Sequence, residues 1–237
     1  MLKKVYFFLN NLVKKIKFKR ISYSLSGVDL IVNYIFKNRK IGFYIDVGCN
    51  HPIKNNNTFL LYKKGWSGIN IDLDKSSIEQ FNFSRPNDEN LNVCISDKTG
   101  ISDFFYYHDK SPINTINKKV NEYHGSKHKE IRTIKTQTLD SILEKSKFKK
   151  DKLNLLSIDV EGNEINVLKG FNLKKYSPDI VIIEFLDLNL KKLELINQNL
   201  STITNSAIYN YMIDNNYFLV NILHSDLIFV NNDMRMI

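Results

Sequence analysis

Cysteine is scarce in this chain: among 237 residues only Cys49 and Cys94 occur, far apart and in different motifs. Neither has the spacing of a metal-ligand pair, and a single disulfide would be unusual in a domain of this size, so a reducing, cytoplasmic location is expected. Internal repeats, low-complexity tracts and long linkers rich in proline or glycine are also missing. With this length, these absences favour one α/β domain that carries a small appendage.

Residues 1–20 lack both acidic residues and an uninterrupted apolar run. Charged residues break every apolar stretch before the roughly 18 residues that a membrane-spanning helix needs. The segment also lacks the apolar core and the small-residue cleavage site of a secretory signal. Of the net charge of +9, seven charges lie in these twenty residues, which leaves +2 for the other 217. The body of the protein is therefore near neutral, which argues against a nucleic-acid partner.

Apolar residues recur at helical spacing in the same segment: Val5, Phe8, Leu9, Leu12, Val13 and Ile16. One interpretation is an interfacial helix on an anionic membrane or an acidic partner. The favoured interpretation is an amphipathic helix packed against the domain, or an oligomer contact, because basic helix faces are usually just solvated. A second amphipathic stretch covers 27–38. We therefore expect a basic helical extension over 1–40 and the main domain over 41–237.

From residue 41 the pattern alternates between strands and helices. Strands are predicted at 41–48, 66–74, 90–96, 152–162 and 179–187, and helices at 56–65, 75–84, 139–146, 163–170 and near 203–214. Two more strands, 101–109 and 130–139, flank a polar loop. The final runs, 217–223 and 226–231, are so close that they must form an antiparallel hairpin. The prediction is a doubly wound, mostly parallel, seven-stranded Rossmann-like sheet with an antiparallel C-terminal hairpin.

Acidic residues end five successive predicted strands: Asp46; Asp72 and Asp74; Asp97, after Ser96; Asp159 and Glu161; and Glu184 and Asp187. The carboxyl ends of parallel strands meet at one rim, where such sheets bind ligands. A single acid there is usually a turn former or a helix cap. Five at one rim need hydroxyls, cations or amide donors to bind, because crowded carboxylates repel one another.

The first loop lacks the G-x-G-x-x-G pattern that brings backbone close to a pyrophosphate, which disfavours a dehydrogenase. Yet Asp72 follows Gly48 by 24 residues, the separation of the acid that binds ribose hydroxyls in nucleotide-binding units. A phosphate-free nucleoside with an amino-acid tail fits better, and this describes S-adenosylmethionine. Asp46 and Gly48 would frame the tail, with Ser96 or Asp97 near the adenine.

Several longer stretches carry a family resemblance. The segments YIDVGCNHPIKNNNTFLLYKKGWSGINIDLD, NVCISDKTG, LLSIDVEGNEINVLKG, PDIVIIEF and DLIFVN, between about residues 41 and 231, resemble the FkbM family of methyltransferases. The resemblance implies a class I methyltransferase fold and S-adenosylmethionine as the cofactor. It also implies methyl transfer mostly to hydroxyl oxygens of sugars or polyketide-type products.

An alcohol is a poor nucleophile at pH 7, so a base or a metal should assist the transfer. We predict that Asp159 or Glu161 is the base and that the other orients the substrate, with Glu184 beside them. Alternatively, Asp159 and Glu184 bind Mg²⁺. His51 is a candidate for assisting proton transfer, although loop histidines more often only form hydrogen bonds.

Three asparagine and threonine side chains complete the predicted cofactor site. Asn50 lies in the first loop, and Asn57 and Thr58 open the helix that follows it. The free N–H groups of that helix suit the cofactor's carboxylate. An equally open alternative is that Asn57 and Thr58 only cap the helix.

The loop at 106–130 mixes aromatic and polar residues, which suits a lid over a sugar ring. We therefore expect an O-methyltransferase acting on a sugar, a glycan or a glycosylated metabolite, with no nucleic-acid partner. A nucleic-acid methyltransferase is the first alternative, but the N/D-P-P-Y type of motif for amino-group methylation is missing. A non-catalytic nucleotide-binding scaffold, tethered by its basic first residues, is the second.

Overall fold

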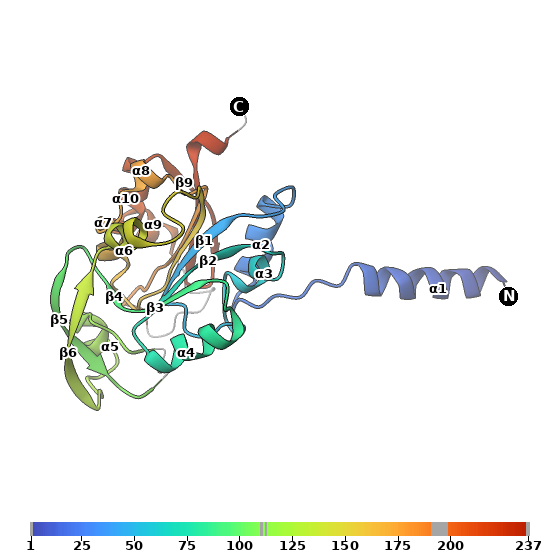
Figure 1. Ribbon diagram of the computed structural model, residues 1–237. Helices are drawn as coiled ribbons and strands as arrows, with labels where there is room; N and C mark the ends of the chain where they lie inside the picture. Colours follow the sequence, from blue (N-terminus) through green and yellow to red (C-terminus); the bar gives the residue numbers. More distant parts are fainter. Residues whose placement is uncertain (1, 110, 112, 191–198, 236–237) are drawn as a thin grey trace.

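A seven-stranded sheet forms the centre of the protein, in a computed structural model that describes residues 2–109, 111, 113–190 and 199–235. Figure 1 shows its strands between two groups of helices. The order is β3 (Glu89–Asn92), β2 (Ser67–Asp72), β1 (Phe43–Val47), β7 (Leu153–Ile158), β8 (Ile180–Glu184), β10 (Asp226–Asn231) and β9 (Tyr217–Leu223). The β8–β10 and β10–β9 pairs are antiparallel, and the other strand pairs described in this sheet are parallel. The predicted doubly wound fold with its C-terminal hairpin is confirmed.

Helices cover both faces because the strands are apolar on both sides. Tyr44 and Leu155 pack under α2 (Val28–Ile35) and α3 (Phe59–Tyr62). Their neighbours Ile45 and Leu156 belong to the larger core on the opposite face. That core is covered by α6 (Leu139–Lys145), α7 (Glu164–Lys169), α8 (Leu173–Tyr176), α9 (Leu200–Thr204) and α10 (Ala207–Asp214). Strands buried on both faces position their carboxyl ends rigidly.

The predicted strand at 90–96 is in fact two strands in two sheets. After β3, the Asn92 side chain donates to the carbonyl oxygens of Asp72 and Leu73 at 2.9 and 2.8 Å, and the chain turns away. Cys94–Ile95 then forms β4 in a second sheet, of order β4-β6-β5, with β5 at Gly100–Tyr106 and β6 at Glu130–Gln137. The alternation of apolar and polar residues along a strand does not indicate which sheet the strand joins. The sequence therefore did not predict that this segment is divided between two sheets.

The first helix, α1 (Leu2–Lys17), stands away from the domain in Figure 1. None of the side chains of Leu2–Lys17 is buried. Of the favoured interpretation, the part that packs this helix on the domain is therefore wrong. The oligomer contact, and the alternative of a membrane contact, stay predictions. By contrast α2, which the sequence grouped with the same extension, packs into the core through Val28 and Val32. Within the part of the chain that the structure describes, no helix is long and apolar enough to cross a membrane.

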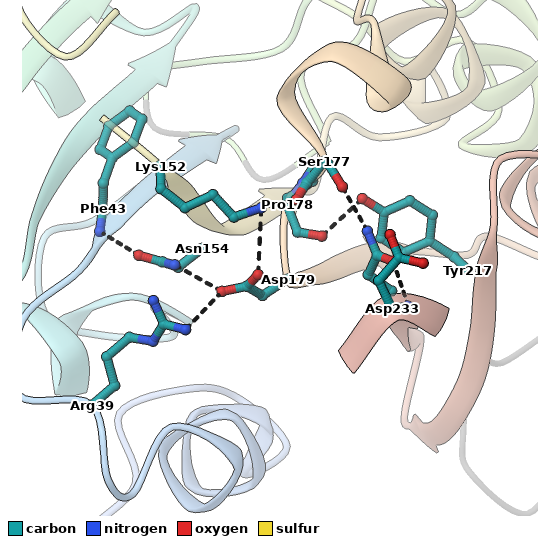
Figure 2. Close-up of polar contacts among 10 residues, drawn as sticks. Arg39, Phe43, Lys152, Asn154, Ser177, Pro178, Asp179, Tyr217 and Asp233 are labelled. Carbon is teal, nitrogen blue, oxygen red and sulfur yellow. Dashed lines mark hydrogen bonds and ion pairs between the residues drawn. The ribbon is translucent and has the colours of Figure 1, made fainter. Parts of the chain in front are cut away.

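The amino ends of the central strands are joined by a polar cluster around Asp179, shown in Figure 2. The Asp179 carboxylate accepts from the Asn154 side chain at 2.7 Å and forms ion pairs with Arg39 and Lys152 at 3.2 and 3.5 Å. Asn154 in turn accepts the Phe43 N–H at 3.1 Å. These contacts join β1, β7 and the start of β8 at the end of the sheet opposite the cavity described below.

Candidate active site

A cavity of about 240 Å³ lies at the carboxyl ends of the central strands. The first loop, the ends of β2, β7 and β8, and the turn between β9 and β10 all contribute side chains to it. The residues that the sequence singled out and that line it are Gly48, Asn50, Asn57, Asp72, Asp74, Asp159, Glu161 and Glu184. The acids at the ends of β2, β7 and β8 therefore converge on one cavity, as predicted, whereas Asp46 and Asp97, predicted to join them, do not line it.

The cavity is strongly acidic. Six carboxylates line it, those of Asp72, Asp74, Asp159, Glu161, Glu184 and Asp226. Among the described lining residues there is no lysine or arginine. A phosphate-bearing ligand would find no cationic partner here, whereas a cation or a set of hydroxyls would be well matched.

Gly48 lets the first loop approach the end of β7. Its φ is +82°, and a Cβ there would lie 1.6 Å from the carbonyl oxygen of Asp159. The Asp159 N–H donates to the Val47 carbonyl at 2.9 Å, which joins the two strand ends directly. Any side chain at position 48 would separate them.

Asp72 is held in one orientation at the end of β2. Its two carboxylate oxygens accept the backbone N–H groups of Asn50 at 2.8 Å and Asp74 at 2.7 Å. Burial raises the pKa of Asp72 to about 6. Each oxygen keeps a lone pair, so the carboxylate can also accept hydroxyl hydrogens from a ligand. Asp74 additionally caps α4 (Lys75–Ser84) by accepting from the N–H groups of Ser76 and Ser77.

Asp46 does not line the cavity. It is buried behind the first loop, where its Oδ2 accepts from Thr58 Oγ1 at 2.8 Å and from Asn56 Nδ2 at 3.1 Å. The geometry does not support a direct contact of Asp46 with a cofactor tail. Its contacts instead hold the loop that carries Asn50 and Asn57.

Two N–H groups at the start of α3, those of Thr58 and Phe59, are already occupied. Asn56 Oδ1 accepts from Thr58 N–H at 3.0 Å and from Phe59 N–H at 2.8 Å. These two N–H groups are therefore not free to bind a cofactor carboxylate, contrary to the expectation for this helix start. Thr58 is fully buried, whereas Asn57 lines the cavity and donates to Ser157 Oγ at 3.3 Å.

Sequence reasoning missed Arg85, a fully buried arginine behind the same loop. Its Nη1 donates to Thr58 Oγ1 at 2.8 Å, and its Nη2 donates to Asn56 Oδ1 at 2.7 Å. Its Nε and Nη2 both donate to the Pro52 carbonyl. The only sequence signal was its place at the end of a helix, before a proline. Arg85 and Asp46 together form the polar support of the first loop.

Ser96 and Asp97 lie outside the residues that line the cavity. Because the chain leaves the main sheet at Val93, the apolar side chains of Val93, Cys94 and Ile95 form that wall instead. Ser96 is buried, and its Oγ lies 3.2 Å from Asp97 Oδ1. The predicted contact of these two residues with adenine depended on an unbroken third strand, which is absent.

His51 also lies outside the lining residues. Its Nδ1 accepts the N–H groups of Ile53 and Lys54, both at 3.0 Å, and so shapes the turn after β1. This geometry favours the hydrogen-bonding alternative over a part in proton transfer.

Three carboxylates at the ends of β7 and β8, those of Asp159, Glu161 and Glu184, form what we call the acid trio. Each offers one oxygen within 4.8 Å of the others. Glu161 has a positive φ of +54°, which few residues other than glycine adopt. Thr115 Oγ1 donates to its carbonyl oxygen at 2.7 Å, and Glu164 accepts the N–H groups of Val160 and Gly162. The backbone is therefore held in the conformation that brings the acids together.

Burial and mutual repulsion raise the pKa values of the acid trio. Burial raises the pKa of Asp159 to about 6. Burial and the charge of Asp159 raise the pKa of Glu161 to about 9, and they raise the pKa of Glu184 well above its usual value. Near neutral pH the trio therefore retains protons, unless a cation neutralises it.

Other lining residues of the cavity come from segments in which the sequence predicted no site residue. Leu25 lies before α2, and Ser111, Asn114 and Ile116 belong to the loop predicted as a lid. Asp226 opens β10 and pairs with Glu184 across the antiparallel strands, and Ser26 Oγ donates to it at 3.2 Å. Since β10 runs antiparallel, its first residue shares a rim with the last residue of β8. The predicted C-terminal hairpin was therefore the sequence signal that could have identified Asp226 as a site residue.

The geometry can be compared with known protein families. The family model described as "Methyltransferase FkbM domain" matches residues 46–218. Neither the search of curated proteins nor that of solved structures found a match. The matched range includes the acid trio and Asp72 but excludes α1, Leu25 and Asp226.

Proposed function

Because the chain belongs to the FkbM methyltransferase family, which implies methyl transfer from S-adenosylmethionine, we propose that its acceptor is a hydroxyl of a sugar, a glycan or a glycosylated metabolite. The observation that carries the proposal is the acidic cavity, whose described lining has six carboxylates and no lysine or arginine. The sulfonium of the cofactor is a cation, and both its ribose and a sugar acceptor present hydroxyls. The same lining would repel the phosphates of a nucleic acid.

In this proposal the cofactor would bind at the carboxyl ends of β1 and β2. Asp72 accepts the ribose hydroxyls, because its carboxylate is already oriented by two backbone N–H groups. The adenine lies against the apolar wall of Val93, Cys94 and Ile95. The amino-acid tail lies along Asn50 and Asn57. The acid trio, which lines the same cavity, would then be left for the acceptor and the transferred methyl group.

The chemistry is an in-line displacement, in which positioning supplies much of the acceleration. The acceptor oxygen attacks the methyl carbon, and the S–C bond breaks with its electron pair on sulfur, which leaves S-adenosylhomocysteine. Asp159 takes the hydroxyl proton, because its pKa of about 6 leaves it ionised at pH 7. Glu161, with a pKa of about 9, is protonated at pH 7 and donates a hydrogen bond that orients the acceptor.

A second candidate mode uses a divalent cation. The acid trio offers three carboxylate oxygens within 4.8 Å of one another, and Mg²⁺ prefers oxygen ligands. When bound, the cation would lower the pKa of the acceptor hydroxyl. Activity in EDTA decides between the modes: abolished activity that Mg²⁺ restores supports the cation, and unchanged activity supports Asp159 as a metal-free base.

Calorimetry with S-adenosylhomocysteine, compared with NAD, tests the cofactor site. We expect binding of S-adenosylhomocysteine alone, weakened by roughly 1–3 kcal/mol in Asp72→Ala, the cost of stranding hydroxyl groups. Asp97→Ala removes an exposed carboxylate outside the cavity and should bind normally. Binding of NAD instead, or equal affinity in both variants, would overturn the assignment.

The acceptor class is tested by release of S-adenosylhomocysteine with three kinds of acceptor: free sugars, oligosaccharides and oligonucleotides. Turnover on a hydroxyl-rich sugar that is lost in Asp159→Asn supports the proposal. Turnover on oligonucleotides would favour a nucleic-acid methyltransferase. Cofactor binding without turnover on any acceptor, unaffected by Asp159→Asn, would favour the scaffold alternative.

A further inference from the structure

The first helix, α1, separates apolar and basic residues onto two faces. Leu2, Val5, Phe8, Leu9, Leu12, Val13 and Ile16 recur at intervals of three and four, so they share one face of the helix. All five lysines of the helix lie on the opposite face, which also carries Asn10, Asn11 and one apolar residue, Phe7, whose ring centroid lies 5.9 Å from Lys3 Nζ. No residue of Leu2–Lys17 lines the cavity.

The apolar face of α1 is uncovered. The exposed fraction of its large apolar side chains runs from 44% at Leu12 to 88% at Leu2. Exposed aliphatic and aromatic surface of this extent on one face marks an interaction site rather than scattered surface residues.

We infer that α1 lies along the surface of an anionic lipid bilayer, with its apolar face in the acyl boundary and its lysines at the headgroups. The charge is complementary: residues 1–20 carry +7, and the first acidic residue of the chain is Asp29. An amphipathic helix with a basic polar face has the features of a helix that lies in the membrane interface.

Two other possible partners of α1 match its positive charge and its apolar face less well. A second copy of α1 would bring two basic helices together, since Leu2–Lys17 has no acidic residue to pair with the lysines. A nucleic acid would satisfy the lysines but would leave the apolar face in water. Only a surface that is both anionic and apolar satisfies the two faces at once.

The contacts that follow α1 place the proposed membrane surface close to the cavity. The Tyr23 N–H donates to Asp29 Oδ2 at 2.7 Å, the Tyr23 hydroxyl accepts from Lys63 Nζ at 2.8 Å, and its ring meets the Phe59 ring edge-on at 4.7 Å between centroids. Two residues later, Leu25 lines the cavity. Only residues 18–22 separate the end of α1 from Tyr23, a span of at most about 22 Å. Membrane binding would therefore hold the Leu25 side of the cavity near the bilayer.

Flotation of the full chain with vesicles tests the inference. One vesicle contains phosphatidylglycerol and phosphatidylcholine, and the other contains phosphatidylcholine alone. We expect binding to the first and little to the second. Lys14→Ala with Lys15→Ala should weaken binding roughly 25-fold, about fivefold for each lysine. Equal binding to both vesicles, or none to either, would overturn the inference.

A matched pair of variants isolates the apolar face. Leu12→Asp and Asn11→Asp change the charge equally at adjacent positions, but Leu12 lies on the apolar face and Asn11 on the polar face. Leu12→Asp should bind vesicles at least tenfold more weakly than Asn11→Asp, because it also loses the insertion of a leucine. Equal losses would indicate a purely electrostatic partner, such as a nucleic acid, and would contradict the inference.

Two further measurements complete the test. Sedimentation that depends on protein concentration, and that Leu12→Asp abolishes, would favour a second copy as the occupant. Affinity for S-adenosylhomocysteine should be unchanged in all these variants, since none of the substituted residues lines the cavity. Failure of this inference is therefore separable from failure of the proposed function.

Discussion

Gly48 and Asp159 approach each other so closely that a Cβ on the glycine would lie 1.6 Å from the aspartate's carbonyl oxygen. This contact joins the first loop, which carries Asn50, to the strand end that carries the acid trio. The cofactor tail and the proton-accepting group of the proposed reaction therefore depend on one backbone approach.

Gly48→Ala should destabilise the fold by about 2–5 kcal/mol, the combined cost of a steric overlap and of a left-handed φ. Gly100→Ala is the control, since the nearest atom to its Cβ would be Thr136 Oγ1 at 3.8 Å. Urea denaturation of both variants measures the difference. A Gly48→Ala protein as stable as Gly100→Ala would show that the loop can move away from Asp159 at little cost.

Arg85→Met should lower the free energy of unfolding by about 3–5 kcal/mol, because it removes the buried donors to Pro52, Thr58 and Asn56 together with the positive charge of the loop support. Arg39→Met removes a partly exposed arginine from Asp179, which keeps Lys152 and Asn154 as partners. The control should therefore cost less than about 1 kcal/mol. Thermal unfolding of the two variants gives the comparison, and similar losses would contradict a supporting role for Arg85.

The stability of the protein without metal should fall as the pH rises from about 4 to about 9. In the unfolded chain the carboxyls of Asp159 and Glu161 titrate near 4. In the folded chain their pKa values are about 6 and about 9, because burial disfavours the ionised forms. The folded state therefore binds these protons more tightly, and ionisation destabilises it.

Glu161→Gln removes the group with the higher of these two pKa values and should flatten the stability curve between pH 6 and pH 9. The melting temperature, measured in EDTA across this range, tests the expectation for the native chain and for the variant. A native curve that rises toward pH 9 would mean that the acid trio does not carry the raised pKa values.

Asp159→Asn should lower kcat by roughly 10²–10⁴-fold, the usual loss when a general base is removed. Binding of S-adenosylhomocysteine should be unchanged. Glu161→Gln should keep most of the activity at pH 7, because a protonated glutamate and a glutamine both donate a hydrogen bond.

The pH profile gives an independent check on the base. The native kcat should rise with pH around 6, where Asp159 ionises. Asp97→Asn, which changes an exposed acid outside the cavity, should show the native profile. If Glu161→Gln were inactive at pH 7 and Asp159→Asn active, the assignment of the base would have to be reversed.

The acids at the strand ends show how much of the site the pattern of residues predicted. Alternating apolar segments predicted the sheet, its C-terminal hairpin and the rim where Asp72, Asp159 and Glu184 meet, since parallel strands end on one side. The pattern failed at Asp46 and Ser96. A side chain one position along a strand points to the other face, and a strand that changes sheets carries its last residues away.

Local order along the chain was thus determined by the sequence alone: which segments form strands and helices, where acids follow them, and how the charge divides between residues 1–20 and the rest. Only the tertiary structure decided which of those acids enter the cavity, that Arg85 and Asp46 support the loop behind it, and that Asp226 faces Glu184. Periodicity and spacing report on neighbours in the chain. These last relations depend on backbone segments far apart in sequence, whose approach is set by packing.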